Sequence, residues 1–593
     1  MKEKSIILSL CLSGHGFSGA VCINGDITSG GSLERITRVK NDILFPFSKA
    51  DLKTFGWNDD PKIYLEYFDY EFDLETDYSK VDISKSKKFT DFIDYLLDSS
   101  SITIDEVTDV VYSYRHIDIV KNYFLERNAK INFLVPEHHF SHACQAFLPS
   151  KFQEAAIMVI DGQGVPMKRT GGDQLCGGLY YGKGNDIKTL HEFPVAYSLG
   201  GMYAAFTKKL GFKTNQEGKT MGLAAYGTAD IYNELVKDLK FEKLDFNLRR
   251  SLKRGLSIHK ALYKLPNYDA FLKRIPDKKS GEEYSKLHKD LAYAVQKLTE
   301  DVMVYLANWL YEHTESENLC IAGGVGLNCV ANYIVLRNSK FKNIFIHPNA
   351  GDNGLVIGQA LYLHNIINVQ DRTYIDTHDY LGKEYSDNII AEAVEKHKAD
   401  TDLEVVHFDE LSNLYSQMAQ FIADGKITCW YQGRSEFGPR ALGNRSILAD
   451  PRREDMKDIL NSRVKFRESF RPFTPSVLAE RSSEYFELDV ESPFMLLAPY
   501  VKKGKAKEIP AITHADNTAR VQTVTRDVNE RYYDLISSFE KLTGVPMLLD
   551  TSFNVADEPI VETPEDAIRC FLSTDIDVIG IGSFLIKKRN RFN

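Results

Sequence analysis

Two histidines and two aspartates in the N-terminal part of the chain have the residue types and spacing of a metal site. His138 and His142 are four residues apart, so they share one face if their segment is helical. Asp161 follows an apolar run, and Asp352 lies in a glycine turn after the apolar stretch 343–346. Two imidazoles and two carboxylates suit a borderline divalent ion such as iron, zinc or manganese. The simpler alternative is a solvated helix start with two aspartates in ordinary turns.

A second group of charged residues, in the C-terminal part of the chain, suits an anion. Segment 433–446 places Arg434, Arg440 and Arg445 among glycines, directly after an apolar stretch. Guanidinium groups present planar forks that match phosphate or carboxylate oxygens, and glycines let the backbone approach a ligand closely. This segment therefore predicts an anion-binding loop.

Segment 465–473 alternates cationic and aromatic residues. If it is extended, its cations share one face and its aromatic residues the other. A wall of cations favours a polyphosphate ligand, whereas the alternative is a surface strand with charges outward and aromatics inward. The expected cationic face carries Lys465, Arg467, Ser469 and Arg471, and the opposite face Phe466 and Phe470.

Strands and turns must position these residues, and the sequence predicts one strand–loop–strand unit twice. Residues 5–25 form the first unit, with Asn24-Gly25 as a hairpin turn. Residues 155–184 repeat this pattern around Asp161. Two such units resemble the duplicated α/β fold of the acetate kinase, Hsc and actin type, whose hairpin loops bind nucleotide phosphates. We therefore expect an α/β fold with a duplicated N-terminal domain.

A third glycine turn follows the strand-like segment 318–320 and precedes a predicted helix at 329–336. Its backbone N–H groups could approach a nucleotide, because glycine permits close contact and a helix N-terminus favours negative charge. The residues concerned are Gly323, Gly324, Gly326 and Asn328.

The bulk composition indicates a soluble globular protein of several domains. The chain has 593 residues, of which 43% are hydrophobic and 26% charged, and its net charge of -10 offers no general footprint for nucleic acid. The apolar segment 6–13 is too short to span a membrane and predicts a core strand. Eight scattered cysteines without a Cys-x-x-Cys pair favour reduced, buried thiols and a cytoplasmic location.

Changes in amino-acid composition along the chain predict its division into domains. Residues 1–370 form the predicted metal-binding domain, with a basic helical insertion at about 228–290. The polar stretch 371–404 is the predicted linker, and residues 405–593 form the second domain, in which an apolar strand starts at about 426.

Taken together and in order, the motifs resemble the O-carbamoyltransferases of the nodulation-factor, cephamycin and tobramycin type. The resemblance covers nearly the whole chain. The motifs that carry it are Glu137-His138-His139-x-x-His142, Ile160-Asp161-Gly162, 221–227, 323–328, Gly351-Asp352-Asn353-Gly354, 438–446, 464–472, 518–524 and 551–554.

The resemblance implies two reaction sites. A YrdC-like C-terminal domain would join carbamoyl phosphate and ATP, with Mg²⁺, into carbamoyladenylate. An N-terminal domain related to threonylcarbamoyl-tRNA transferases would hold a metal, usually Fe²⁺, and pass the carbamoyl group to a hydroxyl of a small natural-product or sugar-like acceptor. The implied metal ligands are His138, His142, Asp161 and Asp352; the catalytic residues are His15, Lys465, Arg467 and Arg471; the cofactor-binding residues are Gly323, Gly324, Gly326, Asn328, Glu217, Lys219, Arg440, Arg445, Arg520, Ser552 and Asn554.

Three alternatives remain at this stage. A tRNA threonylcarbamoyl transferase would need a broad basic surface, and only the 228–290 segment is basic. A hydrogenase-maturation type carbamoylase would carry zinc-finger Cys-x-x-Cys pairs, which the sequence lacks. A nucleotide-binding scaffold without catalysis would not need every charged motif intact. We therefore expect neither a nucleic-acid nor a membrane partner, and leave a homodimer open.

Overall fold

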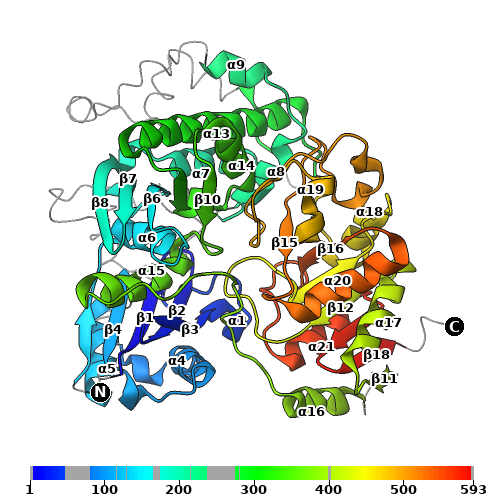
Figure 1. The fold of residues 1–593 in the computed structure, drawn as a ribbon, viewed down its shortest axis with the longest axis horizontal. Coiled ribbons are helices and arrows are strands. Elements are labelled where there is room, and N and C mark those ends of the chain that lie inside the picture. Colours follow the sequence, from blue (N-terminus) through cyan, green and yellow to red (C-terminus); the bar gives the residue numbers. More distant parts are fainter. Residues whose placement is uncertain are drawn as a thin grey trace.

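The structure, a computed structural model, describes residues 4–46, 76, 81–114, 116–128, 130–164, 174–213, 215–236, 274–278, 281–398 and 403–588. Within these residues the strands form three sheets of a mixed α/β fold (Figure 1). Two five-stranded sheets contain the described strands up to residue 346, and one eight-stranded sheet contains those from residue 403 onward. The α/β class predicted from the sequence is confirmed.

The two five-stranded sheets have the same topology. Their strand orders are β3-β2-β1-β4-β5 and β8-β7-β6-β9-β10, read in the same direction. In each sheet the first two pairings are antiparallel and the last two are parallel. The strands are β1 (Ile6–Leu12), β2 (Phe17–Ile23), β3 (Asp26–Ser32), β4 (Asp109–Tyr114) and β5 (Asn132–Leu134), then β6 (Glu154–Ile160), β7 (Leu175–Lys183), β8 (Asp186–Pro194), β9 (Asn318–Ala322) and β10 (Asn343–Ile346).

The sequence repeat therefore corresponds to a structural repeat. The turn predicted at Asn24-Gly25 joins β2 to β3, and both residues have positive φ, 53° and 98°, as a tight hairpin turn requires. The second repeat unit is built from β6, β7 and the loop that starts at Asp161.

Two helices fill the space between these sheets. Helix α6 (His138–Phe147) packs on β6 and β9, helix α15 (Leu355–Leu361) packs on β1, β2 and β4, and the helices pack on each other. Their close approach depends on Gly358, where a Cβ atom would lie 2.3 Å from the backbone oxygen of Ser141. Segment 138–147 contains no β-branched residue, which favours a helix here. The repeat thus encloses one buried apolar layer, to which Phe147 and Ile357 belong.

Other helices cover the outer faces of the two sheets. Helices α4 and α5 pack on the first sheet, and α13 packs on β6 of the second; α7, α8, α9 and α14 pack in turn on α13. Helix α13 begins with a capping box in which Ser285 and His288 satisfy each other's backbone N–H groups. The bounds are α1 (Leu33–Thr37), α4 (Lys87–Ser99), α5 (Ile117–Arg127), α7 (Leu199–Lys209), α8 (Glu217–Ala224), α9 (Asp230–Val236), α13 (Lys286–Thr314) and α14 (Cys329–Asn338).

The eight-stranded sheet forms the core of the C-terminal region. Its order is β11-β18-β17-β12-β13-β16-β14-β15. Every residue of β12 is buried, which requires cover on both faces of the sheet. Its strands are β11 (Leu403–His407), β12 (Thr428–Tyr431), β13 (Arg445–Ala449), β14 (Thr474–Leu478), β15 (Gln522–Val524), β16 (Met547–Ser552), β17 (Val578–Ile581) and β18 (Phe584–Lys588).

Helices α17 and α20 pack on each other and on this sheet, while α21 packs on β12 and α16. Helix α16 lies in the stretch predicted as a linker. The bounds are α16 (Asp387–Lys398), α17 (Leu411–Ala423), α18 (Met456–Leu460), α19 (Ser482–Tyr485), α20 (Glu530–Thr543) and α21 (Pro564–Ser573).

The structure bears on three further expectations. Helix α9 and the start of α13 fall in the predicted insertion at 228–290, whereas residues 237–273 of it lie outside the described residues. All eight cysteines are described, and each is buried and free, as predicted. Within the described ranges, no helix has the length and apolar character needed to cross a bilayer.

Candidate active sites

The four predicted metal ligands come together at the meeting point of the two repeated sheets. Helix α6 supplies His138 and His142, Asp161 follows β6, and Asp352 follows β10. All four residues are buried, and one potential ligand atom from each lies within 4.8 Å of those of the other three. The helix spacing and the two strand-end turns thus build one cluster from three distant segments, which we call the His–Asp cluster.

Each imidazole of this cluster faces a carboxylate. His138 Nε2 lies 3.2 Å from Asp161 Oδ2, and His142 Nε2 lies 3.4 Å from Asp352 Oδ1. Burial opposes a charged Asp161, but the hydrogen bond with His138 and the charge of His142 outweigh it and lower the pKa of Asp161. Burial likewise opposes a charged His142, but Asp352 and Asp161 raise the pKa of its imidazole. Without a metal, the cluster therefore favours ion pairs.

A glutamine fixes the orientation of the His142 ring. The side-chain amide of Gln145 donates to the backbone oxygen of Asn349 at 2.5 Å, which turns its Oε1 towards His142 Nδ1 at 2.7 Å. Because that oxygen only accepts, Nδ1 carries the proton and Nε2 is the atom directed at the cluster. The sequence reasoning missed Gln145, although its spacing of three from His142 on one helix was a usable signal.

The glycine turn 323–328 supports the same cluster. The backbone N–H of Gly324 donates to Asp161 Oδ1 at 3.0 Å, which leaves Oδ2 facing His138. A Cβ atom at Gly323 would lie 2.2 Å from the backbone oxygen of Ile160, so only glycine fits there, at φ 90°. Asn328 instead caps α14 by accepting from the N–H of Ala331. Gly326 closes the turn by donating its backbone N–H to Gly323.

His15 and a third histidine lie beside the cluster. The loop of His15 approaches the turn of Asp352, since a Cβ atom at Gly16 would lie 3.1 Å from Asn353 Oδ1. His15 is exposed and lies near Glu217. Burial raises the pKa of the Glu217 carboxyl, and the charge of His15 offsets part of that rise. His139, which the sequence reasoning did not assign, places Nε2 3.8 Å from Asp161 Oδ2.

Five cationic residues gather in the C-terminal region, and we call them the cation cluster. Burial lowers the pKa of each of them, and the charges of neighbouring members lower it further for every member except Arg471. The members are Arg440, Lys465, Arg467, Arg471 and Arg520. Arg440 comes from the loop between β12 and β13, and Arg520 lies just before β15.

Several buried donors of this region have no acceptor among the residues that the structure describes. Arg440 Nε, Arg520 Nε and Asn461 Nδ2 are buried and have no hydrogen-bond partner in the described part of the chain. A buried donor without an acceptor costs free energy, and buried donors of this kind are rare in folded proteins. Here several of them lie next to a cluster of positive charge. The arrangement therefore suits a ligand with several acceptor oxygens and negative charge.

Lys465 joins two other predicted site residues. It is only 4% exposed, and its Nζ donates to the backbone oxygen of Ser552 at 2.5 Å and to Asn554 Oδ1 at 2.7 Å. These contacts hold the ammonium group at the end of β16. The structure thus brings Lys465, Ser552 and Asn554 together.

The conformation of the segment that carries three members of this cluster differs from the predicted one. Segment 465–473 is not an extended strand: a π-helical turn ends at Lys465, Phe466 has φ 44°, and a loop follows. Phe466 is 68% exposed whereas Phe470 is buried, so the two aromatic residues do not share a face. Among the described strands none pairs with this segment to enforce the alternation, and tertiary packing decided the conformation.

The Arg445 side chain is bound by backbone carbonyl groups. It is fully buried, donates to the backbone oxygens of Gln432, Gly433 and Asn444, and stacks 3.6 Å from the ring centroid of Tyr431. Its guanidinium is therefore occupied by the protein's own carbonyl groups. Lys219 is also engaged by the protein, since its Nζ lies 2.7 Å from Glu468 Oε1.

The sequence reasoning gave no role to one residue near the cation cluster. His514 is largely buried, and its pKa falls to about 4 because of burial and the charges of Lys457 and Arg520. It lies just before the motif 518–524, but no residue pattern at position 514 itself signalled a site.

Helix α14 and its glycine turn connect the two clusters. Gly324 contacts Asp161, whereas Cys329, five residues later, lies near Arg520 and Arg440. Burial raises the pKa of the Cys329 thiol, and the charges of these two arginines oppose that rise.

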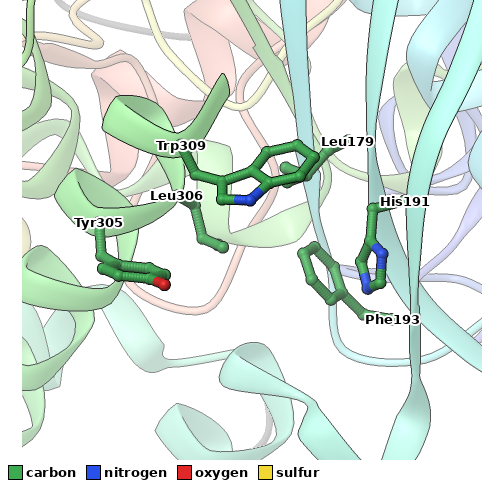
Figure 2. A pocket seen from close by; sticks show the side chains of 6 residues that line it. All are labelled: Leu179, His191, Phe193, Tyr305, Leu306 and Trp309. Atoms are coloured by element: carbon green, nitrogen blue, oxygen red, sulfur yellow. The ribbon is translucent and has the colours of Figure 1, made fainter. Parts of the chain in front are cut away.

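A separate aromatic cavity lies between the β7–β8 hairpin and α13 and contains none of the predicted site residues (Figure 2). It is lined by Leu179, His191, Phe193, Tyr305, Leu306 and Trp309.

Two family models and several sequence relatives match the chain. A family model described as the carbamoyltransferase N-terminus matches residues 8–361, and one described as the carbamoyltransferase C-terminus matches residues 419–588. Nodulation protein NolO of Bradyrhizobium diazoefficiens is 39% identical over 76% of this chain and 79% of its own length. Nodulation protein NolNO of Sinorhizobium fredii is also 39% identical, over 78% of this chain and 64% of its own length.

Two more comparisons concern an uncharacterised relative and a solved structure. The uncharacterised protein sll1178 of Synechocystis is 40% identical over 77% of this chain and 76% of its own length. The crystal structure of full-length HypF in its phosphate- and nucleotide-bound form is 13% identical, with a TM-score of 0.29, over 62% of this chain and 47% of that one. A likeness this low has no bearing on function.

Proposed function

The chain belongs to the carbamoyltransferase family and is a transferase, and we propose that it carries out ATP-dependent O-carbamoylation in two steps at two sites. The first step would form carbamoyladenylate at the cation cluster. The second would transfer the carbamoyl group to a hydroxyl of a small natural-product or sugar-like acceptor at the His–Asp cluster. The proposed domains are residues 1–370, of the duplicated actin and Hsc type, and residues 405–593, of the YrdC-like type, joined by residues 371–404.

The donor set of the His–Asp cluster fits a divalent transition metal. His138, His142, Asp161 and Asp352 would hold it, because their ligand atoms converge, are shielded from water and combine nitrogen with oxygen. Fe²⁺ is the proposed ion, with Zn²⁺ and Mn²⁺ as alternatives that the same donors accept. When bound, such an ion would neutralise negative charge that develops on the carbamoyl or phosphate oxygens during transfer.

The cation cluster would serve the adenylation step. Lys465, Arg467, Arg471 and Arg440 would neutralise the phosphates of ATP, accompanied by Mg²⁺, and of carbamoyl phosphate. Carbamoyl phosphate loses phosphate to water, and the resulting carbamate oxygen attacks the α-phosphorus of ATP and displaces pyrophosphate. Unpartnered donors such as Arg440 Nε and Arg520 Nε would find their acceptors on these oxygens.

The transfer step would use residues beside the metal ligands. The acceptor hydroxyl oxygen attacks the carbamoyl carbon, the bond between that carbon and the adenylate oxygen breaks, and AMP leaves. His15, on the loop next to the Asp352 turn, would take the hydroxyl proton. Because carbamoyladenylate is labile in water, formation and use within one molecule would limit its hydrolysis.

The observation that carries this proposal is that one chain contains two buried clusters that suit ligands of opposite charge. The His–Asp cluster suits a cation, and the cation cluster suits a polyanion. The test is to incubate the protein with ATP, carbamoyl phosphate, Fe²⁺ and a panel of hydroxylated metabolites. We expect mass spectrometry to find one acceptor that gains a single carbamoyl group. If ATP and carbamoyl phosphate are not consumed under any condition, a nucleotide-binding scaffold without catalysis is the better description.

A further inference from the structure

Helix α8 joins the N-terminal region to the loop that carries most of the cation cluster. Figure 1 shows α8 at the boundary that faces the C-terminal region. A Cβ atom at Gly222 would lie 3.6 Å from Pro472 Cδ, and Met221 Sδ lies 3.9 Å from Cys329 Sγ. Lys219, on the same helix, reaches across to Glu468 of the loop. A residue of one region thus makes an ion pair inside the charge cluster of the other.

Glu468 stands between two cations, but its side chain is within hydrogen-bond distance of only one of them, Lys219. Lys219 Nζ lies 2.7 Å from Glu468 Oε1, whereas the nearest contact of Arg471, from Nη1 to Glu468 Oε2, is 3.9 Å. Glu468 Oε2 is buried and has no hydrogen-bond partner among the described residues. The backbone N–H of Arg471 donates to the oxygen of Glu468, so one turn keeps both side chains within reach. Glu468 would therefore bond Arg471 fully if Lys219 released it.

Aromatic packing makes this ion pair stronger than an ordinary surface pair. Phe470 packs against Tyr284 and Phe212, with ring centroids 5.5 and 6.2 Å away, and Lys219 Nζ lies 5.7 Å from the centroid of Phe212. Side-chain exposure is 21% for Lys219 and 30% for Glu468. Reduced contact with water raises the effective attraction between opposite charges. The pair is thus able to hold Glu468 in place.

We propose that Lys219 is a positioning residue that acts on the anion site through Glu468: it holds this carboxylate away from Arg471, so that the Arg471 guanidinium stays available to a substrate phosphate. The inference rests on the proposed function, since it names what makes the adenylation site competent. It also replaces the expectation that Lys219 binds the nucleotide directly. Adenylate formation would then depend on a residue of the N-terminal region.

The test is a double-mutant cycle with Lys219→Met and Glu468→Gln, read as KM for carbamoyl phosphate and kcat of pyrophosphate release by the full-length protein. Lys219→Met frees Glu468 to neutralise Arg471, so we expect KM to rise about tenfold with kcat changed much less. Glu468→Gln alone leaves KM equal to wild type or lower. The double variant returns KM to near the wild-type value, because without Glu468 there is nothing for Lys219 to hold.

The matched control is another lysine–glutamate pair across the same two regions. Lys151 Nζ lies 3.3 Å from Glu491 Oε2, and both side chains are exposed, at 64% and 71%. Lys151→Met and Glu491→Gln should leave both constants unchanged. Lys219→Arg should keep KM within about twofold of wild type, because it preserves the ion pair.

Each outcome decides the matter. If Glu468→Gln fails to suppress the defect of Lys219→Met, Lys219 contacts the substrate directly and the inference is wrong. If Lys219→Met leaves KM unchanged while wild type is active, the pair has no role in the site and the inference is also wrong. If wild type itself releases no pyrophosphate, the proposed function fails instead, and pyrophosphate binding by calorimetry then tests the charge argument with the same four proteins.

Discussion

The two clusters differ in how their charge is balanced. In the His–Asp cluster every imidazole faces a carboxylate, and the side chains come from a regular helix and from strand ends. In the cation cluster five positive groups face one another, and apart from the end of the π-helical turn they come from loops. The first is preorganised and nearly neutral; the second keeps a surplus of positive charge that a ligand must offset. This difference predicts separable behaviour, which the following changes test in order of expected size.

Removal of one proposed metal ligand should abolish only the transfer step. His142→Ala deletes a nitrogen that points into the cluster, so we expect loss of bound metal and at least a hundredfold decrease, on the order of magnitude seen for metal-site lesions, in carbamoyl transfer. Carbamoyladenylate formation should continue. Elemental analysis and separate assays of the two half-reactions measure this, with the exposed His407→Ala as control. Full metal occupancy in His142→Ala would contradict the assigned ligands.

The reverse pattern is expected for Lys465→Ala. Loss of a buried ammonium beside substrate phosphates should cost about 2 kcal/mol or more, which is roughly a 30-fold decrease in adenylate formation. Transfer from freshly supplied carbamoyladenylate should remain. Lys503→Ala, at an exposed position, is the control. If Lys465→Ala and His142→Ala each lose both half-reactions while folded, one composite site performs all the chemistry and the contrast between the clusters is wrong.

Two arginines of one sequence motif should respond differently. Arg445→Met removes a guanidinium from three buried carbonyl groups, so the free energy of unfolding should fall by about 3 kcal/mol, measured by urea denaturation. Arg440→Met relieves repulsion among buried cations, so stability should stay unchanged or rise while KM for carbamoyl phosphate increases. An active, fully stable Arg445→Met with a raised KM would instead place Arg445 at the substrate.

The smallest effect is an opposite pH dependence of ligand affinity at the two sites. Metal must displace the proton of His142, whose pKa is raised, so Mn²⁺ affinity should increase with pH until that imidazole is neutral, by at most about tenfold per pH unit. Burial and Arg467 lower the pKa of Lys465, so pyrophosphate affinity should decrease as pH rises through that lowered value. Calorimetric titrations between pH 5.5 and 9 measure both; equal slopes at the two sites would contradict the charge assignment.

Local patterns determined the repeated unit and the members of the His–Asp cluster. An apolar strand followed by an aspartate and a glycine, and two histidines four residues apart, leave few alternatives, because strand ends and helix faces fix where side chains point. The structure accordingly places His138, His142, Asp161 and Asp352 together. The Asn24-Gly25 turn was predictable for the same reason, since its backbone needs residues that tolerate positive φ.

Only the tertiary structure decided which cations share a site. Arg440 and Arg445 stand in one motif, yet Arg445 is buried on backbone carbonyls and Arg440 joins Arg520 from a segment 80 positions away. The alternation in 465–473 predicted an extended face, but none of the strands that the structure describes pairs with it and the segment folds as a loop. Loops take their conformation from distant contacts, such as Lys219 with Glu468, and periodicity does not record those contacts. Residue types therefore indicated that an anion site exists, whereas long-range packing determined its members.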